Sequence, residues 1–139
     1  AIAPLAPITS GRASGVLVGG NLAVLAALVG TPYAPPLDGT VLFLEDIGER
    51  PYRVDRMLTS MIQAGWFARV SAVLVARFTD CDAGADGTTV DDVVRDRLRP
   101  LAIPVLAGVP AGHVEDNMPL HLGKRVRVDA DVGAVAPDA

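Results

Sequence analysis

Short apolar runs and amphipathic stretches alternate along most of this 139-residue chain. The apolar runs lack polar alternation, so both faces of each predicted strand should be buried, as in the middle of a parallel sheet. These strands are predicted at 16–18, 40–44, 70–76 and 103–107. A last run, at 125–128, alternates polar and apolar residues and predicts a half-exposed strand.

Three amphipathic stretches separate these strands and predict helices. The first follows Asn21, a residue type suited to an N-cap, and the second begins at Pro51, which suits a first helical turn. The third follows Thr89 as its N-cap and ends at Pro100. This order of strands and helices predicts an α/β domain with a partly parallel central sheet.

The two ends of the chain have no such pattern. Residues 1–14 are rich in Pro, Ala and Ser and are expected to be a linker or a truncated start, which leaves 15–139 as one domain. The chain starts at Ala1 without an initiator Met, so a preceding segment with any targeting signal is expected to be missing. Beyond 128 the chain is expected to be irregular.

Composition narrows the classes of partner. The net charge is −4 and no Lys/Arg cluster stands apart from acidic residues, which argues against nucleic acid. No apolar run reaches the ~18 residues of a membrane span, so no membrane partner is expected. Half of the residues are hydrophobic, which indicates an apolar face meant for a partner. Cys81 is the single cysteine, which excludes an internal disulfide and indicates a spectator thiol.

Glu45 and His113 are the strongest candidates for chemistry. Glu45 directly follows a buried strand, and His113 lies in a loop after another. Parallel strands would bring both residues to one edge of the sheet, where α/β proteins build their sites. A carboxylate bound to one imidazole nitrogen fixes the tautomer and leaves the other nitrogen as a base. The alternative is that Glu45 caps the next helix and His113 is an ordinary loop residue.

No nucleophile is evident within the chain. The motif Gly-x-Ser-x-Gly, which marks a nucleophile elbow, is absent. Ser14 is expected in a turn, Ser60 in a helix and Ser71 inside a strand, which leaves Ser10 and Cys81 without a supporting pattern. A Glu45–His113 pair would therefore have to serve a nucleophile from outside this chain.

Four stretches, in this order and spacing, resemble the C-terminal domain of the LD-carboxypeptidase family, which includes murein tetrapeptide carboxypeptidases and microcin-immunity peptidases. They are 19–22 (Gly-Gly-Asn-Leu), 44–58 (which begins Leu-Glu-Asp-Ile-Gly-Glu), 103–105 (Ile-Pro-Val) and 112–113 (Gly-His). The resemblance runs from about 15 to 128. It departs from the family pattern at Ala76 and at His121, neither of which touches the proposed pair.

The resemblance implies a layered β/β/α domain and a Ser-Glu-His triad. Glu45 and His113 match the Glu and His, while the Ser belongs to an N-terminal domain of the same protein that is absent here. The implied reaction is hydrolysis of the bond between an L-residue and D-Ala in murein tetrapeptides, as in peptidoglycan recycling, and the chain alone would be inactive. A cytoplasmic homodimer without a cofactor is expected.

Further residues near the candidate pair receive lesser roles. Asn21 is expected near the cleft, where it either contacts substrate or acts only as an N-cap. Asp46 and Glu49 are expected to shape an acidic mouth. His121 is a weak rival of His113, because it follows no strand end.

Three other functions have weaker support in the sequence. A calcium loop at 80–91 is disfavoured, because Ala85 stands where that loop needs Gly, and no metal is expected. A Rossmann-like dinucleotide-binding unit would use Gly19 and Gly20 with Glu45, but the third Gly of its fingerprint is missing. A non-catalytic dimerisation module would leave the Glu45 and His113 side chains apart.

Overall fold

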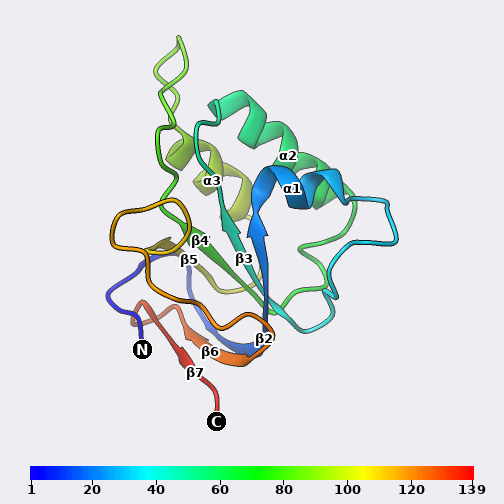
Figure 1. The fold of residues 1–139 in the computed structure, drawn as a ribbon, viewed down its shortest axis with the longest axis vertical. Helices are drawn as coiled ribbons and strands as arrows, with labels where there is room; N and C mark the ends of the chain where they lie inside the picture. Colours follow the sequence, from blue (N-terminus) through cyan, green and yellow to red (C-terminus); the bar gives the residue numbers. More distant parts are fainter.

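The computed structural model describes residues 1–139 and contains three helices and seven strands (Figure 1). In chain order they are β1 (Ala6–Thr9), β2 (Arg12–Asn21), α1 (Leu22–Ala27), β3 (Val41–Glu45), α2 (Pro51–Gln63), β4 (Ala72–Ala76), α3 (Val90–Leu98), β5 (Val105–Val109), β6 (Arg125–Asp129) and β7 (Ala134–Pro137). The predicted helices are all present, with Asn21 and Thr89 as N-caps.

All seven strands form one sheet in the order β1-β5-β4-β3-β2-β6-β7. Strands β2, β3, β4 and β5 pair in parallel. The outer strands β1, β6 and β7 pair antiparallel. The predicted α/β class with a partly parallel central sheet is therefore confirmed.

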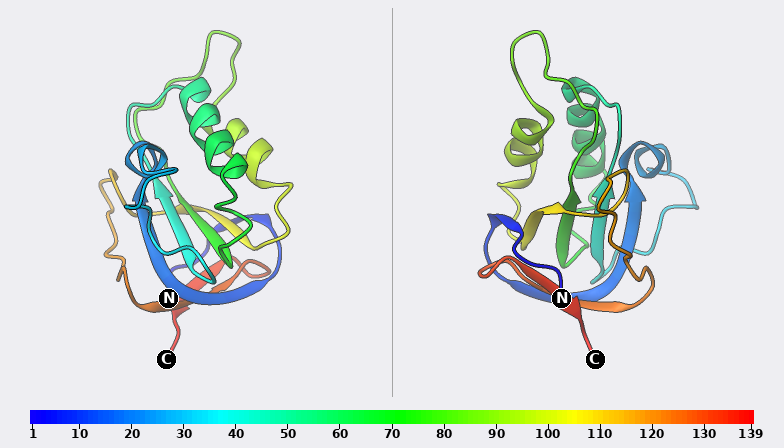
Figure 2. Two further views of the ribbon diagram at one scale, coloured as in Figure 1. Left: turned by 90° about the vertical axis from the view of Figure 1, so that its right-hand side faces the viewer. Right: turned by 60° about the vertical axis from the view of Figure 1, so that its left-hand side comes forward.

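Strand β2 belongs to both parts of this sheet. Its second half, from Leu17, pairs in parallel with β3, and its first half, up to Val16, pairs antiparallel with β6. Figure 2 shows β2 bending between these two partners, so that the sheet curls over itself. Gly15 lies at this bend, where an added Cβ would overlap the carbonyl oxygen of Gly39. The curl produces the β/β/α layering that the family resemblance implies.

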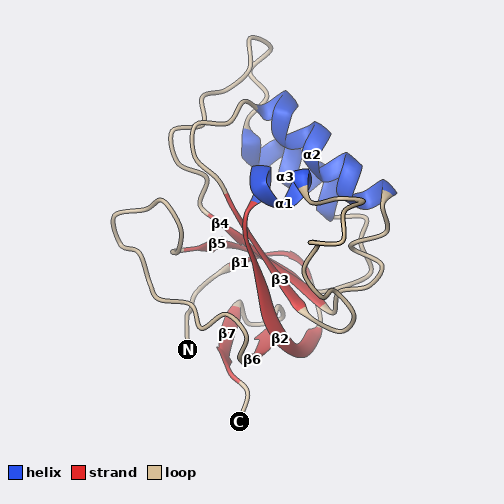
Figure 3. Ribbon diagram, turned by 45° about the vertical axis from the view of Figure 1, so that its right-hand side comes forward, coloured by secondary structure: helices blue, strands red, loops and turns tan.

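Two apolar cores fill the space between these layers. One, of 19 buried residues, lies between the sheet and the helices, and the other, of 14, lies inside the curl. Strand β3 contributes Leu42 and Leu44 to the first core and Val41 and Phe43 to the second. Figure 3 shows the helices on one side of the sheet only. The central strands lack polar alternation because both of their faces are covered.

The expectation that residues 1–14 form a linker is wrong, because these residues pair with the sheet. Strand β1 pairs with β5, β2 already begins at Arg12, and Ile2 bridges to Val135. Pro7 cannot donate to a ladder, but β1 is the outer neighbour of β5, and edge strands tolerate proline. The conformation of β1 depends on its pairing with β5, about a hundred residues later, so the local pattern of residues does not predict it.

The expectation of an irregular tail beyond 128 is also wrong. Residues Ala134–Pro137 form β7, which pairs antiparallel with β6 in register Val128↔Val135. The strand is short and contains three small or cyclic residues among its four, so it has little apolar signal of its own.

No helix in the structure combines the length and the apolarity needed to cross a bilayer.

A matched pair of substitutions tests whether the antiparallel layer is part of the same cooperative unit. Val128 is completely buried, whereas Val132, four residues later, is 66% exposed. We expect Val128→Ala to lower the free energy of unfolding by about 2 kcal/mol, because two buried carbons and their packing are lost. Val132→Ala should change it by less than about 0.5 kcal/mol. Urea unfolding followed by circular dichroism measures both, and equal effects would contradict the proposed packing.

Candidate active site

Glu45 is the last residue of β3 and lies at the carboxyl edge of the parallel sheet. Its side chain is only 9% exposed. A buried carboxylate is costly unless hydrogen bonds or an opposite charge compensate it. A partner for Glu45 is therefore required by its position.

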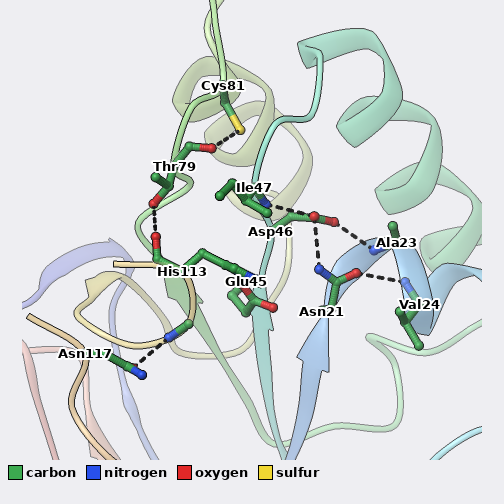
Figure 4. Close-up of polar contacts among 11 residues, drawn as sticks. Asn21, Ala23, Val24, Glu45, Asp46, Ile47, Thr79, Cys81, His113 and Asn117 are labelled. Atoms are coloured by element: carbon green, nitrogen blue, oxygen red, sulfur yellow. Dashed lines mark hydrogen bonds and ion pairs between the residues drawn. The ribbon is translucent and has the colours of Figure 1, made fainter. Parts of the chain in front are cut away.

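His113 provides that partner from the loop after β5. Its Nδ1 lies 2.8 Å from Oε2 of Glu45, across 68 residues of sequence (Figure 4). The predicted contact between these two side chains is confirmed. The alternative of a non-catalytic dimerisation module predicts that they lie apart. The imidazole is 51% exposed, and its Nε2 makes no hydrogen bond within the chain. With Nδ1–H donating to Glu45, Nε2 is left as a proton acceptor directed away from the carboxylate.

The close approach of the two segments depends on Gly112. A Cβ at this position would lie 2.7 Å from Glu45 Oε2 and 2.9 Å from its Cγ, so a side chain would displace the carboxylate. The backbone φ of Gly112 is +97°, a conformation that L-residues rarely adopt. The steric overlap and the positive φ both require glycine at position 112, directly before His113.

The loop that carries His113 is closed by its own hydrogen bonds. The amide of Gly112 donates to Oδ1 of Asn117 at 3.1 Å, and the amide of Met118 donates to the carbonyl of Pro110 at 2.7 Å. These bonds shape residues 110–118 into a compact turn. They do not attach the turn to the rest of the domain.

Asp46 does not shape an acidic mouth as expected, because it is 4% exposed and points to the helix side. Its carboxylate accepts hydrogen bonds from Asn21 Nδ2 at 3.0 Å, from the amide of Ala23 at 2.9 Å and from the amide of Ile47 at 2.8 Å. Anionic acceptors are favourable at a helix N-terminus, where amides lack partners. Asp46 therefore anchors the start of α1 beside β3.

Asn21 is the N-cap that the sequence indicates, and its Oδ1 accepts a hydrogen bond from the amide of Val24 at 3.1 Å. Its amide nitrogen is oriented by Asp46 (Figure 4). One N–H of the carboxamide has no partner in the chain, so Asn21 retains a free donor. Contact with substrate stays a prediction.

Glu49 and Cys81 flank the site without joining the Glu45–His113 pair. Glu49 Oε2 lies 3.2 Å from Arg53 Nε, one helical turn later, without hydrogen-bond alignment. Burial raises the pKa of the Cys81 thiol, and its Sγ lies 3.2 Å from the carbonyl oxygen of Thr79. A raised pKa disfavours the reactive thiolate, consistent with a spectator role.

An open hollow of about 250 Å³ adjoins Glu45. Phe43, Glu45 and Gly112 form part of its wall, and no Lys or Arg lines it. His121, the weaker rival of His113, lines a separate hollow at the mouth of the curled sheet. Glu45 is thus the one charged residue that lines the hollow, and His113 contacts Glu45 without lining it.

A buried carboxylate that orients an imidazole at the carboxyl edge of a parallel sheet is an arrangement suited to acid–base chemistry. The family model described as "LD-carboxypeptidase C-terminal domain" matches residues 14–128. The chain belongs to this family of peptidases and is similar to its C-terminal domain.

Relatives support the assignment but are longer than this chain. A carboxypeptidase homologue from Synechocystis sp. is 39% identical over 96% of the chain and 46% of its own length. The murein tetrapeptide carboxypeptidase of Pseudomonas aeruginosa is 31% identical over 81% of the chain and 37% of its own length. The chain spans less than half the length of these relatives.

Solved structures have the same fold. The muramoyltetrapeptide carboxypeptidase of Oxalobacter formigenes superimposes with a TM-score of 0.82 at 33% identity, over 91% of this chain and 44% of that one. A microcin C7 self-immunity protein in complex with aspartyl sulfamoyl adenosine gives a TM-score of 0.85 at 26% identity, over 97% and 41%. The layered architecture is therefore that of LD-carboxypeptidases.

Substitution of Gly112 tests how the two segments approach. Gly112→Ala should break the Glu45–His113 contact, because the new Cβ overlaps the carboxylate. Gly123→Ala is the control, since φ is +81° there but no atom lies within 4 Å of an added Cβ. Both variants carry a backbone strain of about 1–2 kcal/mol. The ¹⁵N shifts of the His113 ring should report a single Nδ1–H tautomer in the control and a mixture in Gly112→Ala, and the same tautomer in both would refute this account.

Proposed function

We propose that this chain supplies the Glu and His of a Ser-Glu-His triad in a serine LD-carboxypeptidase. The serine would come from an N-terminal domain of the same protein. The substrate is a murein tetrapeptide, and the bond hydrolysed joins an L-residue to the terminal D-Ala. The observation that carries the proposal is the 2.8 Å contact between Glu45 Oε2 and His113 Nδ1.

In the proposed reaction, His113 Nε2 takes the proton of the serine hydroxyl as its oxygen attacks the peptide carbonyl carbon. Glu45, as the buried anion on the other ring nitrogen, stabilises the imidazolium that forms. His113 then gives this proton to the amine of the departing D-Ala as the C–N bond breaks. Water hydrolyses the acyl-enzyme, and His113 again serves as the base.

An external nucleophile is consistent with the positions of the serines in this chain. Ser71 precedes β4, at the end of the parallel strands opposite to Glu45, and its Oγ donates to the carbonyl of Thr40 at 2.9 Å. Ser14 pairs with Arg127 of β6. Ser10 lies between β1 and β2, and Ser60 lies on the exposed side of α2. None of them is hydrogen-bonded to His113.

The substrate class rests on the relatives. Proteins named as murein tetrapeptide or muramoyltetrapeptide carboxypeptidases share 31–33% identity with this chain. The hollow beside Glu45 is partly lined by Phe43 and has no cationic side chain, so it offers no ion pair to the phosphates of a dinucleotide. This lining disfavours the dinucleotide alternative.

Replacing the carboxylate tests the catalytic role in the longer protein that includes the serine-bearing domain. Glu45→Gln keeps the volume but removes the anion and favours the wrong imidazole tautomer, so kcat on murein tetrapeptide should fall by about 10⁴-fold. The control is Glu115→Gln, because Glu115 is exposed, two residues after His113, and makes no ion pair. Release of D-Ala measures both variants. Wild-type turnover in Glu45→Gln would refute the triad.

A second test separates the chain from its proposed partner domain. The chain alone should not release D-Ala from murein tetrapeptide, since the attacking hydroxyl is expected elsewhere. Adding the serine-bearing domain in trans should restore turnover, and adding that domain with its serine replaced by alanine should not. Release of D-Ala by the chain alone would contradict the proposal.

A further inference from the structure

Thr79 connects the two segments that carry the Glu45–His113 pair. It lies just after β4, in the loop before α3, and is itself part of neither segment. Its Oγ1 donates a hydrogen bond to the carbonyl oxygen of His113 at 2.5 Å. Figure 4 shows Thr79 between the His113 loop and the turn that follows Glu45.

The main chain of Thr79 is held by the segment after Glu45. Ile47 and Thr79 form an isolated parallel bridge. The amide of Gly48 donates to the carbonyl of Thr79 at 2.9 Å, and the amide of Thr79 lies 3.4 Å from the carbonyl of Asp46. Asp46 is itself buried and fixed by three hydrogen bonds. The main chain of Thr79 is therefore held in place next to Glu45.

The His113 loop has few other attachments. Its bonds from Gly112 to Asn117 and from Met118 to Pro110 are internal to the loop. Three hydrogen bonds connect residues 110–118 to other elements. The amide of Ala111 donates to the carbonyl of Val109 at the end of β5 at 2.9 Å, and the other two are the bond from Thr79 and the bond between Glu45 and the His113 ring. The Thr79 hydroxyl thus makes the one hydrogen bond to the main chain of His113 itself.

We propose that Thr79 is a positioning residue, whose hydroxyl holds the His113 peptide so that Nδ1 stays on Glu45 and Nε2 keeps a constant direction. Without this bond the half-exposed ring would depend on the Glu45 contact alone, and the loop could rotate about it. A displacement of about 1 Å in a catalytic group can cost about 10² in rate. The consequence for turnover rests on the proposed triad, whereas the consequence for the ring does not.

Three variants isolate the hydroxyl. Thr79→Val has nearly the same shape but lacks the donor, and Thr79→Ser retains the donor. Thr59→Val is the matched control, because it removes a hydroxyl that donates to Asp55 Oδ1 at 3.3 Å on α2. All three leave the main-chain bonds of Thr79 in place. Thermal unfolding first establishes that each variant is folded.

The first measurement uses the 139-residue chain and does not depend on activity. The ¹⁵N shifts of the His113 ring, at a pH where the ring is neutral, should show one Nδ1–H tautomer in wild type, Thr79→Ser and Thr59→Val. Thr79→Val should show a mixture of tautomers. A Thr79→Val ring indistinguishable from wild type would overturn the inference, as would a Thr79→Val chain that fails to fold, since Thr79 would then be a general stability residue.

The second measurement uses the longer protein with its serine-bearing domain. Thr79→Val should lower kcat for D-Ala release roughly tenfold to a hundredfold with KM within about twofold, and Thr79→Ser should restore kcat. Equal losses in both variants would refute a role for the hydroxyl. If wild type releases no D-Ala, the proposed function fails while the ring shifts still decide the role of Thr79.

Discussion

A hydrogen bond between a buried carboxylate and a half-exposed imidazole is the interaction around which this domain is arranged. Glu45 loses most of its hydration at the end of β3, and an uncompensated buried carboxylate costs several kcal/mol. His113 Nδ1 compensates it at 2.8 Å. The parallel pairing of β3 with β4 and of β4 with β5 makes this contact possible, because it brings the ends of both segments to one edge. The topology therefore determines the chemistry that the edge can support.

The parts of the fold that could be predicted from sequence are those whose signal is local. Buried strands such as β3 and β4 appear as unbroken apolar runs, and the helices begin at recognisable caps such as Thr89. The Glu45–His113 contact was also predictable, since each residue follows a buried strand. In contrast, β1 and β7 are short outer strands, and their conformation depends on distant pairing partners. No window of sequence around them contains that information.

Two residues of the site were beyond sequence reasoning for a related reason. Asp46 stands next to Glu45 and has the same charge, so the sequence predicted that it shapes an acidic mouth beside the Glu45–His113 pair. The structure separates them, because Asp46 accepts three hydrogen bonds at the start of α1. Thr79 had no distinguishing pattern, because its role depends on the carbonyl of His113, 34 residues later. Residues that hold a site together are recognised by what they contact. Contacts between loops produce no periodic pattern in the sequence, so sequence alone does not predict them.

The side chains of Glu45 and Asp46 point to opposite faces of the sheet because side chains alternate along a strand with a period of two residues. Along β3, Val41 and Phe43 face the core inside the curl, and Glu45 continues this series toward His113. Leu42 and Leu44 face the helices, and Asp46 continues that series toward α1. A one-residue slip of β3 would exchange the two carboxylates and place the anion that orients His113 against a helix N-terminus instead. The register that packs the two cores is thus the same register that selects which of two adjacent acids contacts His113.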